Sequence, residues 1–570
     1  MRTLPARLSH ARRLGSLGIG VVAASALVAG CGSGGTKAGA TASTVADFVP
    51  AGAPMYFEVS TDFGGPQWQQ VDSLAKLFPS YPKMRAQLDK DLSSGGVSFQ
   101  NDVRPLLGSR AAMAVLKLPP ASSVSNGMGS SSSSSSSSAT TSTTGLTTMA
   151  PMAAAAAAKD ADVVAVVSLA SGKDAQAEAL LAKESTGTPT EVDGVKAYKL
   201  KDKSGAEAAV MDGAIVMASN EADLKSALDA HKAGGSQTLA GNSRFTDTIA
   251  KLPADTFGQF YVDAGAVVQQ QAADNAQLRS LGLADMTNAR VAGSVAAEAD
   301  GVRIKSVTVG ATGQKQTEFS PTLVDKVPAD AIAFADGSDL GAQVQQLLTA
   351  VRSGTGTSTS GSSQQFDQVL GQITPMLGVS TDDLKALVSK ETGLVVTSGS
   401  EPGVVLTSQV ADPARAQRTL DTLREHLTPL VAGLSQGTQK LPAWKQVDLA
   451  GGTTGWNLPL STTGGVTYGI DGSLAYIGTN PAAVRAVEQP AQPLSQLADY
   501  TAAVKDMPSS VTGVAWMNGA ETVRLVQAMG QAKTANQREA LNNAKQIKNI
   551  VAWSTGGDQP TSEMFIRIAK

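Results

Sequence analysis

One pattern occurs four times along this chain: an apolar residue and a proline, a short apolar stretch, a turn of small residues, and a helix-like run. Proline has no N–H to donate to a sheet, so it suits the first position of a strand. Each copy therefore predicts a strand that leads into a helix. The four copies begin at Val49–Ala51, Leu252–Ala254, Val327–Ala329 and Met507–Ser509.

Each of these units also closes with two stretches of strand-like residues that we expect to pair as a hairpin. The four pairs are Arg110–Leu118 with Asp162–Leu169, Ala289–Ala297 with Val302–Gly310, Gly393–Thr397 with Val404–Val410, and Asn549–Ser554 with Glu563–Ala569. The repeated unit is therefore a strand, a helix and a hairpin.

A second block lies between the first and second units and again between the third and fourth. It consists of three short strands and a helix, with the last two strands joined across Asp212-Gly213 in one copy and Asp471-Gly472 in the other. Asp-Gly between alternating strands is typical of a type I′ turn, where a positive φ favours these residues. We therefore interpret these two aspartates, which take equivalent places in the pattern, as turn residues and not as catalytic ones.

Because independent features recur in the same order, the sequence predicts an internal duplication. The fold class that follows is α+β, with two tandem related domains at residues 45–312 and 317–570. Each domain is expected to be a mainly antiparallel sheet with helices packed on one face. Tandem placement and a pseudo-twofold relation both remain open. Low-complexity insertions rich in Ser, Thr, Ala or Gly interrupt the copies at 119–159 and 353–365.

The first 30 residues have the pattern of a secretory signal peptide. Four arginines and no acids precede the apolar run Leu14–Leu27, which is shorter than the roughly 20 residues that cross a bilayer. Small residues stand at its end. A cleaved leader at residues 1–30 is therefore expected.

The segment Leu27-Val28-Ala29-Gly30-Cys31 resembles the lipobox of bacterial lipoproteins, and Cys31 is the only cysteine in the 570 residues. The resemblance implies cleavage between Gly30 and Cys31 and lipidation of Cys31. The alternative is an ordinary cleavage site beside a cysteine. Residues 31–44 are then a flexible tether with a reach on the order of 20 Å. The expected location is the outer face of the cell membrane, or the periplasm-facing membrane where the cell has an outer membrane.

The sequence contains few candidate catalytic or metal-binding residues. Of three histidines, His10 leaves with the leader, while His231 and His426 have no second ligand nearby in sequence, so no metal site is expected. Asp382-Asp383 follows Ser380 as in a helix capping box. We expect no catalytic, cofactor-binding or metal-binding residues. Without the four leader arginines the charge falls from −3 to −7, which argues against nucleic acid as a partner.

The opening Phe48-Val49-Pro50-Ala51, followed by Met55-Tyr56-Phe57-Glu58-Val59-Ser60, resembles bacterial envelope proteins classed as domain of unknown function 3352. The resemblance implies an extracytoplasmic protein and supplies no catalytic residues. The expected function is a non-catalytic binding or scaffolding role in the cell envelope, with the membrane contacted through Cys31 and an envelope protein or an apolar ligand as partner. Two alternatives remain: a carrier of a lipid or other apolar ligand, and an envelope hydrolase that uses Asp and Glu residues.

Overall fold

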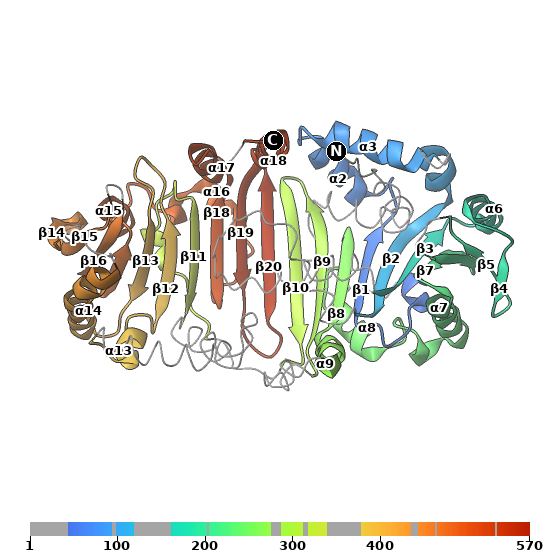
Figure 1. Cartoon of the computed structure of the whole chain (residues 1–570), viewed down its shortest axis with the longest axis horizontal. Coiled ribbons are helices and arrows are strands. Elements are labelled where there is room, and N and C mark those ends of the chain that lie inside the picture. Colours follow the sequence, from blue (N-terminus) through green and yellow to red (C-terminus); the bar gives the residue numbers. More distant parts are fainter. Residues whose placement is uncertain are drawn as a thin grey trace, which may run out of the picture.

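The computed structural model describes residues 44–93, 98–118, 161–201, 205–274, 287–311, 317–338, 378–434, 443–461, 464–530 and 533–569. Within them, 20 strands form one sheet in which every neighbouring pair is antiparallel (Figure 1). Residues 44–311 are called the first half below, and residues 317–569 the second half. The predicted insertions at 119–159 and 353–365 lie outside the described residues.

The first half contributes ten strands. They are β1 (Met55–Ser60), β2 (Leu107–Lys117), β3 (Asp162–Leu169), β4 (Thr190–Val192), β5 (Val195–Lys199), β6 (Glu207–Met211), β7 (Ala214–Ala218), β8 (Gly258–Asp263), β9 (Arg290–Glu298) and β10 (Gly301–Val309). Their order across the sheet is β4-β5-β6-β7-β3-β2-β1-β8-β9-β10.

The second half also contributes ten strands. They are β11 (Ala333–Ser338), β12 (Glu391–Val396), β13 (Val404–Gln409), β14 (Lys445–Asp448), β15 (Thr454–Pro459), β16 (Gly465–Asp471), β17 (Leu474–Gly478), β18 (Gly513–Asn518), β19 (Ile547–Ser554) and β20 (Thr561–Ile568). Their order is β14-β15-β16-β17-β13-β12-β11-β18-β19-β20, which is the order of the first half with every number raised by ten.

The two halves meet where β10 pairs with β20 over seven residue pairs, from Gly301 opposite Arg567 to Val307 opposite Thr561. We call this β10–β20 pair the seam. It differs from the expectation of one sheet per domain. Each half ends on a hairpin whose last strand has an unpaired edge, and an unpaired edge is a template for another strand. The two edges satisfy each other, so a single sheet runs through both halves (Figure 1).

Helices cover both faces of the sheet, not one face as expected. In the first half they are α2 (Pro66–Ala75), α3 (Tyr81–Ser93), α6 (Asp174–Glu184), α7 (Glu221–Ala233), α8 (Ser243–Ile249) and α9 (Ala264–Asp274). In the second half they are α13 (Thr381–Ala386), α14 (Pro413–Leu434), α15 (Pro481–Glu488), α16 (Ala498–Ala503), α17 (Gly519–Ala528) and α18 (Ala535–Ala544).

The alternation along β1 shows why both faces need a cover. Tyr56 packs with Leu228 of α7 in one buried cluster, whereas its neighbour Phe57 packs with Leu74 of α2 in another. Successive side chains of a strand point to opposite faces, so a strand that is apolar at every position must be buried on both. Apolar side chains from Met55 to Val59 lie on both faces of β1, with Glu58 as the one acid among them, and all five residues are buried, which explains the two layers of helices.

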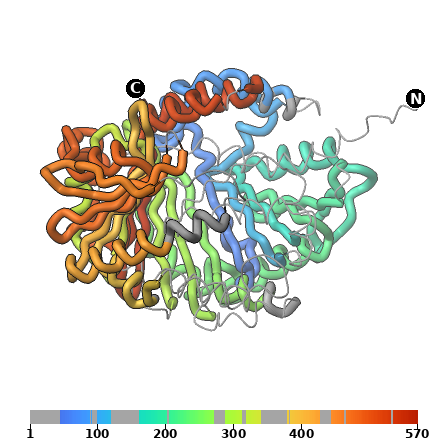
Figure 2. Tube along the Cα trace, turned by 60° about the vertical axis from the view of Figure 1, so that its left-hand side comes forward, coloured from blue at the N-terminus to red at the C-terminus, as the bar shows by residue number. Residues whose placement is uncertain are grey.

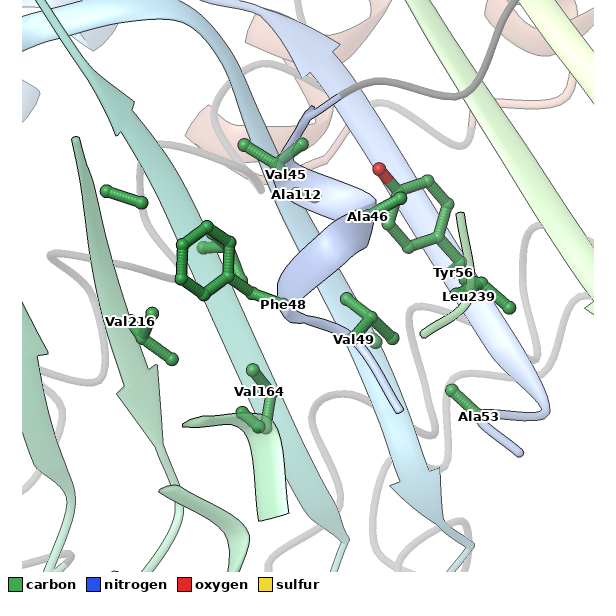
Figure 3. Packing of buried hydrophobic residues seen from close by; sticks show 14 of the residues in the cluster. Val45, Ala46, Phe48, Val49, Ala53, Tyr56, Ala112, Val164, Val216 and Leu239 are labelled. Carbon is green, nitrogen blue, oxygen red and sulfur yellow. The ribbon is translucent and has the colours of Figure 1, made fainter. Parts of the chain in front are cut away.

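The short 3-10 helix η1 (Thr44–Phe48) closes one of these cores directly after the predicted tether. Phe48 projects from it toward Val164 of β3 and Val216 of β7, and Val45 lies near Ala112 of β2 (Figure 3). The ring of Phe48 also stacks on His231 at the end of α7, with 3.7 Å between ring centroids. The folded body therefore begins at its first described residues.

The hairpins predicted from the sequence are confirmed. β2 pairs with β3, β9 with β10, β12 with β13 and β19 with β20. The Asp212-Gly213 turn is also confirmed, with φ of 47° and 75°. The proposed equivalence of Asp471 is wrong by one residue, because Asp471 still pairs with Leu474 as the last residue of β16 and the positive φ falls on Gly472.

The two halves also touch through helices. Lys83 of α3 forms an ion pair with Glu539 of α18 at 2.7 Å, and Ser80 donates its backbone N–H to Asn543 Oδ1 at 3.2 Å. Figure 2 shows these blue and red helices side by side. The first of these two contacts is exposed and the second is partly buried, so each contributes little to stability. The seam is therefore the main connection between the two halves.

Candidate functional site

An apolar surface spans four neighbouring strands in the second half. Ala335 of β11 stands opposite Leu394 of β12 and Ala515 of β18, and Leu394 stands opposite Leu406 of β13. Residues in register on one face of a sheet form a continuous surface. We call this surface the apolar face and define it by Ala333, Ala335, Leu394, Val396, Val404, Leu406, Ala515 and Met517.

The apolar face is partly open to solvent. Leu394 is 39% and Val404 38% exposed, and the other six residues are partly exposed. In the first half Phe57, which corresponds to Ala335, and Phe260, which corresponds to Ala515, are buried, whereas Met113, which corresponds to Leu394, is partly exposed. Adjacent exposed aliphatic side chains in a sheet mark an interaction surface more strongly than scattered ones. The apolar face is therefore the candidate binding surface.

A pair of acidic side chains lies on the other side of the same strands. Asp336 of β11 and Glu391 of β12 are each 6% exposed, and Glu391 lies diagonally across from Asp336 on the neighbouring strand. We call Asp336 and Glu391 the carboxyl pair. Burial raises the pKa of Asp336 well above its usual value, and the charge and hydrogen bond of Glu391 raise it further.

The two members of the carboxyl pair have different surroundings. Glu391 accepts hydrogen bonds from the backbone N–H groups of Thr322 (2.5 Å) and Leu323 (2.7 Å), from the Thr322 hydroxyl (2.5 Å) and from the Gln409 amide (3.0 Å). In the described part of the chain, neither carboxyl oxygen of Asp336 has a well-formed hydrogen bond, and the backbone N–H of Gly337 acts on this carboxyl group only weakly. The donors at Glu391 suit a carboxylate, whereas the surroundings of Asp336 suit a neutral acid.

The first half holds a different pair at the matching positions. Arg110 stands opposite Ser60 as Glu391 stands opposite Ser338, and Glu58 lies two residues before Ser60 as Asp336 lies before Ser338. There Arg110 Nη1 lies 3.2 Å from Glu58 Oε1, and the Tyr56 hydroxyl donates to Glu58 Oε2 at 2.5 Å. An ion pair in one half thus corresponds to two acids in the other.

A third group of charges lies at the seam. Arg303 of β10 is 4% exposed, pairs with Glu298 and Glu563, and has its guanidinium carbon 4.2 Å from the ring centroid of Phe565. Burial alone would lower the pKa of Arg303, but the two carboxylates outweigh it and raise the pKa above its usual value. This group holds the two halves together and faces no open surface.

Among the described residues singled out in the sequence, His231 lies beside Asp212 and Ser380 beside Asp383, and they form no common site. Gly30 and Cys31 lie outside the described residues, so the lipidation prediction stays a prediction. His231 lies in the last turn of α7, with Nε2 3.1 Å from Asp212 Oδ2, and His426 lies on α14. The capping box at Ser380 and Asp383 is confirmed.

Two further observations concern the described part of the chain only. No three or more His, Cys, Asp or Glu residues gather there in a way that could hold a metal ion. None of its helices is both long and apolar enough to cross a membrane.

The carboxyl pair and the apolar face were missed in the sequence. The clue was one acid inside each of the two central strands, Glu58 and Asp336, where alternation predicts only apolar or neutral residues. The partners Arg110 and Glu391 lie about 50 residues further along the chain. Only the register of β1 with β2 and of β11 with β12 places them beside those acids.

Comparisons with known proteins give one strong and two weak results. No curated protein matches the chain. Crystal forms III and I of TP0453 are similar at TM-scores of 0.21 and 0.20, with 11% and 9% sequence identity over 44% of this chain and 93% and 92% of theirs. Such low scores carry no argument about fold or function. The family described as "Protein of unknown function (DUF3352)" matches residues 14–568, as the resemblance at Phe48–Ser60 implied, and this chain therefore belongs to the DUF3352 family.

Proposed function

We propose that this protein is an exported, lipid-anchored envelope protein that binds a partner without catalysing a reaction, and that the apolar face is its binding surface. The observation that carries the proposal is the exposure of Leu394 and Val404 on neighbouring strands, within a surface of only aliphatic side chains. The buried carboxyl pair does not compete as a hydrolase site, because a substrate has no access to groups that are 6% exposed.

The anchor is tested by the variant Cys31→Ser in the cell of origin. Two or three acyl chains would hold the protein firmly, because each buried methylene contributes about 0.8 kcal/mol. The variant is expected to move from the membrane fraction to the soluble extracytoplasmic fraction, which immunoblotting of both fractions measures. Metabolic labelling with a fatty acid should mark the wild type and not the variant. Tight membrane association of the unlabelled variant would contradict the anchor.

The binding surface is tested by Leu394→Lys and Val404→Lys. A lysine places a charge on the apolar face but keeps its flexible stem in solvent, so folding should persist while apolar binding is lost. Leu460→Lys is the matched control, because Leu460 is 50% exposed and lies outside the apolar face. Binding of an apolar fluorescent probe should fall at least about tenfold in the two face variants, a change of roughly 1.4 kcal/mol, and stay unchanged in the control. Equal binding by all three variants would rule out this surface.

A carrier of lipid is the second candidate. One property of the apolar face favours a lipid over a protein partner. The face contains no hydrogen-bonding or charged side chain, whereas protein interfaces carry polar groups. Organic extraction of the purified protein followed by mass spectrometry decides between them. Lipid that co-purifies with the wild type and Leu460→Lys, and not with Leu394→Lys, would favour the carrier.

We also propose that the two halves arose by duplication of one ancestral unit. The support is the strand order, which repeats with every number raised by ten, and the antiparallel seam between the equivalent strands β10 and β20. Antiparallel pairing of equivalent strands is the arrangement that a pseudo-twofold axis through the seam would produce. Superposition of the two halves of an experimental structure would test this relation.

A further inference from the structure

We propose that Asp336 and Glu391 share a single proton in the folded protein, and that loss of this proton loosens the second half of the sheet. The carboxyl pair then acts as a built-in sensor of pH. The inference is independent of the binding function proposed above and concerns residues that no comparison assigns a role.

The geometry carries the first step. A hydrogen bond between two carboxyl groups needs a proton on one of them, because an ionised carboxylate can only accept. Asp336 and Glu391 are both buried and lie diagonally across from each other on neighbouring strands, and in the described residues neither oxygen of Asp336 has a well-formed hydrogen bond. Glu391 already accepts four hydrogen bonds. The arrangement is complete when Asp336 is the neutral acid and donates its proton to Glu391.

The comparison between halves carries the second step. In the first half, Arg110 lies beside Glu58 and supplies a positive charge to the buried acid. In the second half, the position of Arg110 is taken by Glu391, so an attractive pair becomes a repulsive one when both groups are ionised. A proton is the smallest positive charge that can replace the guanidinium. Two carboxyl groups that lie close together cannot both be ionised without a cost in free energy.

Among the described residues, no positively charged side chain acts on Asp336 to offset that repulsion. The groups that face Asp336 come from the strands beside it and from α16: Gly393 and Val514 stand opposite it, Glu391 lies diagonally, and Tyr500 interacts with it across the core. Tyr500 is neutral, and its pKa is raised by burial and by the charges of Asp336 and Asp325. In the described part of the chain, the one group that lowers the pKa of Asp336 is the backbone N–H of Gly337.

The direction of the pH effect follows from the raised pKa of Asp336. The folded state binds this proton more tightly than the unfolded state, in which the pKa is about 3.9. The contribution to stability is therefore full below that pH and is lost as the pH rises toward the folded-state pKa. Because Ala335 of the apolar face is the chain neighbour of Asp336, the loss acts on a strand that carries the apolar face.

Urea unfolding of the wild type and Asp336→Asn across a range of pH tests the proposal. Asparagine cannot ionise, so the ratio of the two unfolding equilibrium constants isolates the Asp336 proton. This ratio should change by up to about tenfold per pH unit in favour of the variant, until the folded-state pKa is passed. Val514→Ala is the control: Val514 is 2% exposed opposite Asp336, and its truncation should shift stability by the same factor at every pH. A pH-independent ratio for Asp336→Asn would overturn the proposal.

Infrared spectroscopy observes the proton directly and does not need Asp336→Asn to fold. Protein labelled with ¹³C at the aspartate carboxyl carbon should show a shifted carboxylic-acid band at pH values above the unfolded-state pKa of about 3.9. Asp223 is a second aspartate whose pKa is raised, by burial and the charge of Asp162, so the measurement is made in Asp223→Asn. A band that persists in this background above that pH and disappears as the pH is raised further supports the proposal. Its absence above that pH contradicts the proposal, and so does its persistence in Asp336→Asn where that variant folds.

Discussion

Replacing Arg303 by Met should lower the free energy of unfolding by about 3–5 kcal/mol. Arg303 lies in the seam, 4% exposed, between Glu298 and Glu563 and over the ring of Phe565. Methionine keeps much of the buried volume but removes the positive charge, which leaves Glu298 and Glu563, themselves 18% and 11% exposed, without their shared partner. Leaving buried charges unpaired costs more than the ion pair itself contributes.

Lys305→Met is the matched control for Arg303→Met. Lys305 lies two residues further along β10 and also contacts Glu563, at 3.0 Å, but its side chain is 41% exposed. An ion pair that solvent screens contributes about 0–1 kcal/mol, so this variant should stay close to the wild type. Urea unfolding followed by circular dichroism measures both. Equal, small losses for the two variants would show that the seam does not depend on the buried guanidinium.

The hairpins could be predicted from the sequence because they are local. Pairs such as β9 with β10 need only two alternating stretches and a short turn, and the order of proline, strand and helix gives the same answer in every unit. The two-layer cover of β1 was visible as well, because Met55, Tyr56, Phe57 and Val59 place apolar side chains on both faces of the strand, although one covered face was expected. A strand buried on one face alternates apolar and polar residues, whereas a strand buried on both faces is apolar at most positions.

The seam could not be predicted in this way. Gly301–Val307 and Thr561–Arg567 lie about 260 residues apart, and neither stretch carries a pattern that names the other as its partner. Any unpaired antiparallel edge satisfies another equally well, because the ladder uses backbone groups only. Side chains such as Arg303 and Glu563 favour this partner strand by forming an ion pair across the seam. That ion pair can be recognised only once the register of the two strands is known.

The carboxyl pair illustrates the same limit within one half. Glu391 is unremarkable as a single residue, since acids at strand ends are common on protein surfaces, and Asp336 inside β11 does not indicate its partner. Their burial at 6% follows from η6 (Leu323–Lys326) and α16, which cover that end of β11 and β12. A pKa perturbed by burial is a property of the packed fold, so the residue type alone cannot reveal it.

Gly301→Ala should lower the free energy of unfolding by about 3 kcal/mol, the upper end for overpacking. A Cβ at Gly301 would lie 2.2 Å from the carbonyl oxygen of Ile566 and 2.8 Å from Cα of Arg567, both on the partner strand of the seam. These are backbone atoms that no rotamer change can move, so β10 and β20 must separate locally. Gly52→Ala is the control, because nothing lies within 4 Å of its Cβ position. Its effect should stay within about 0.5 kcal/mol.

The shape of the unfolding curve tests more than the size of the loss. If the seam couples the halves into one cooperative unit, the wild type should unfold in a single transition, and Gly301→Ala should split it in two because each half keeps its own buried clusters. Near- and far-ultraviolet circular dichroism would then give different midpoints for the variant and coincident midpoints for the wild type. A single, merely shifted transition in Gly301→Ala would mean that the helix contact between Lys83 and Glu539, and not the seam, suffices to join the halves.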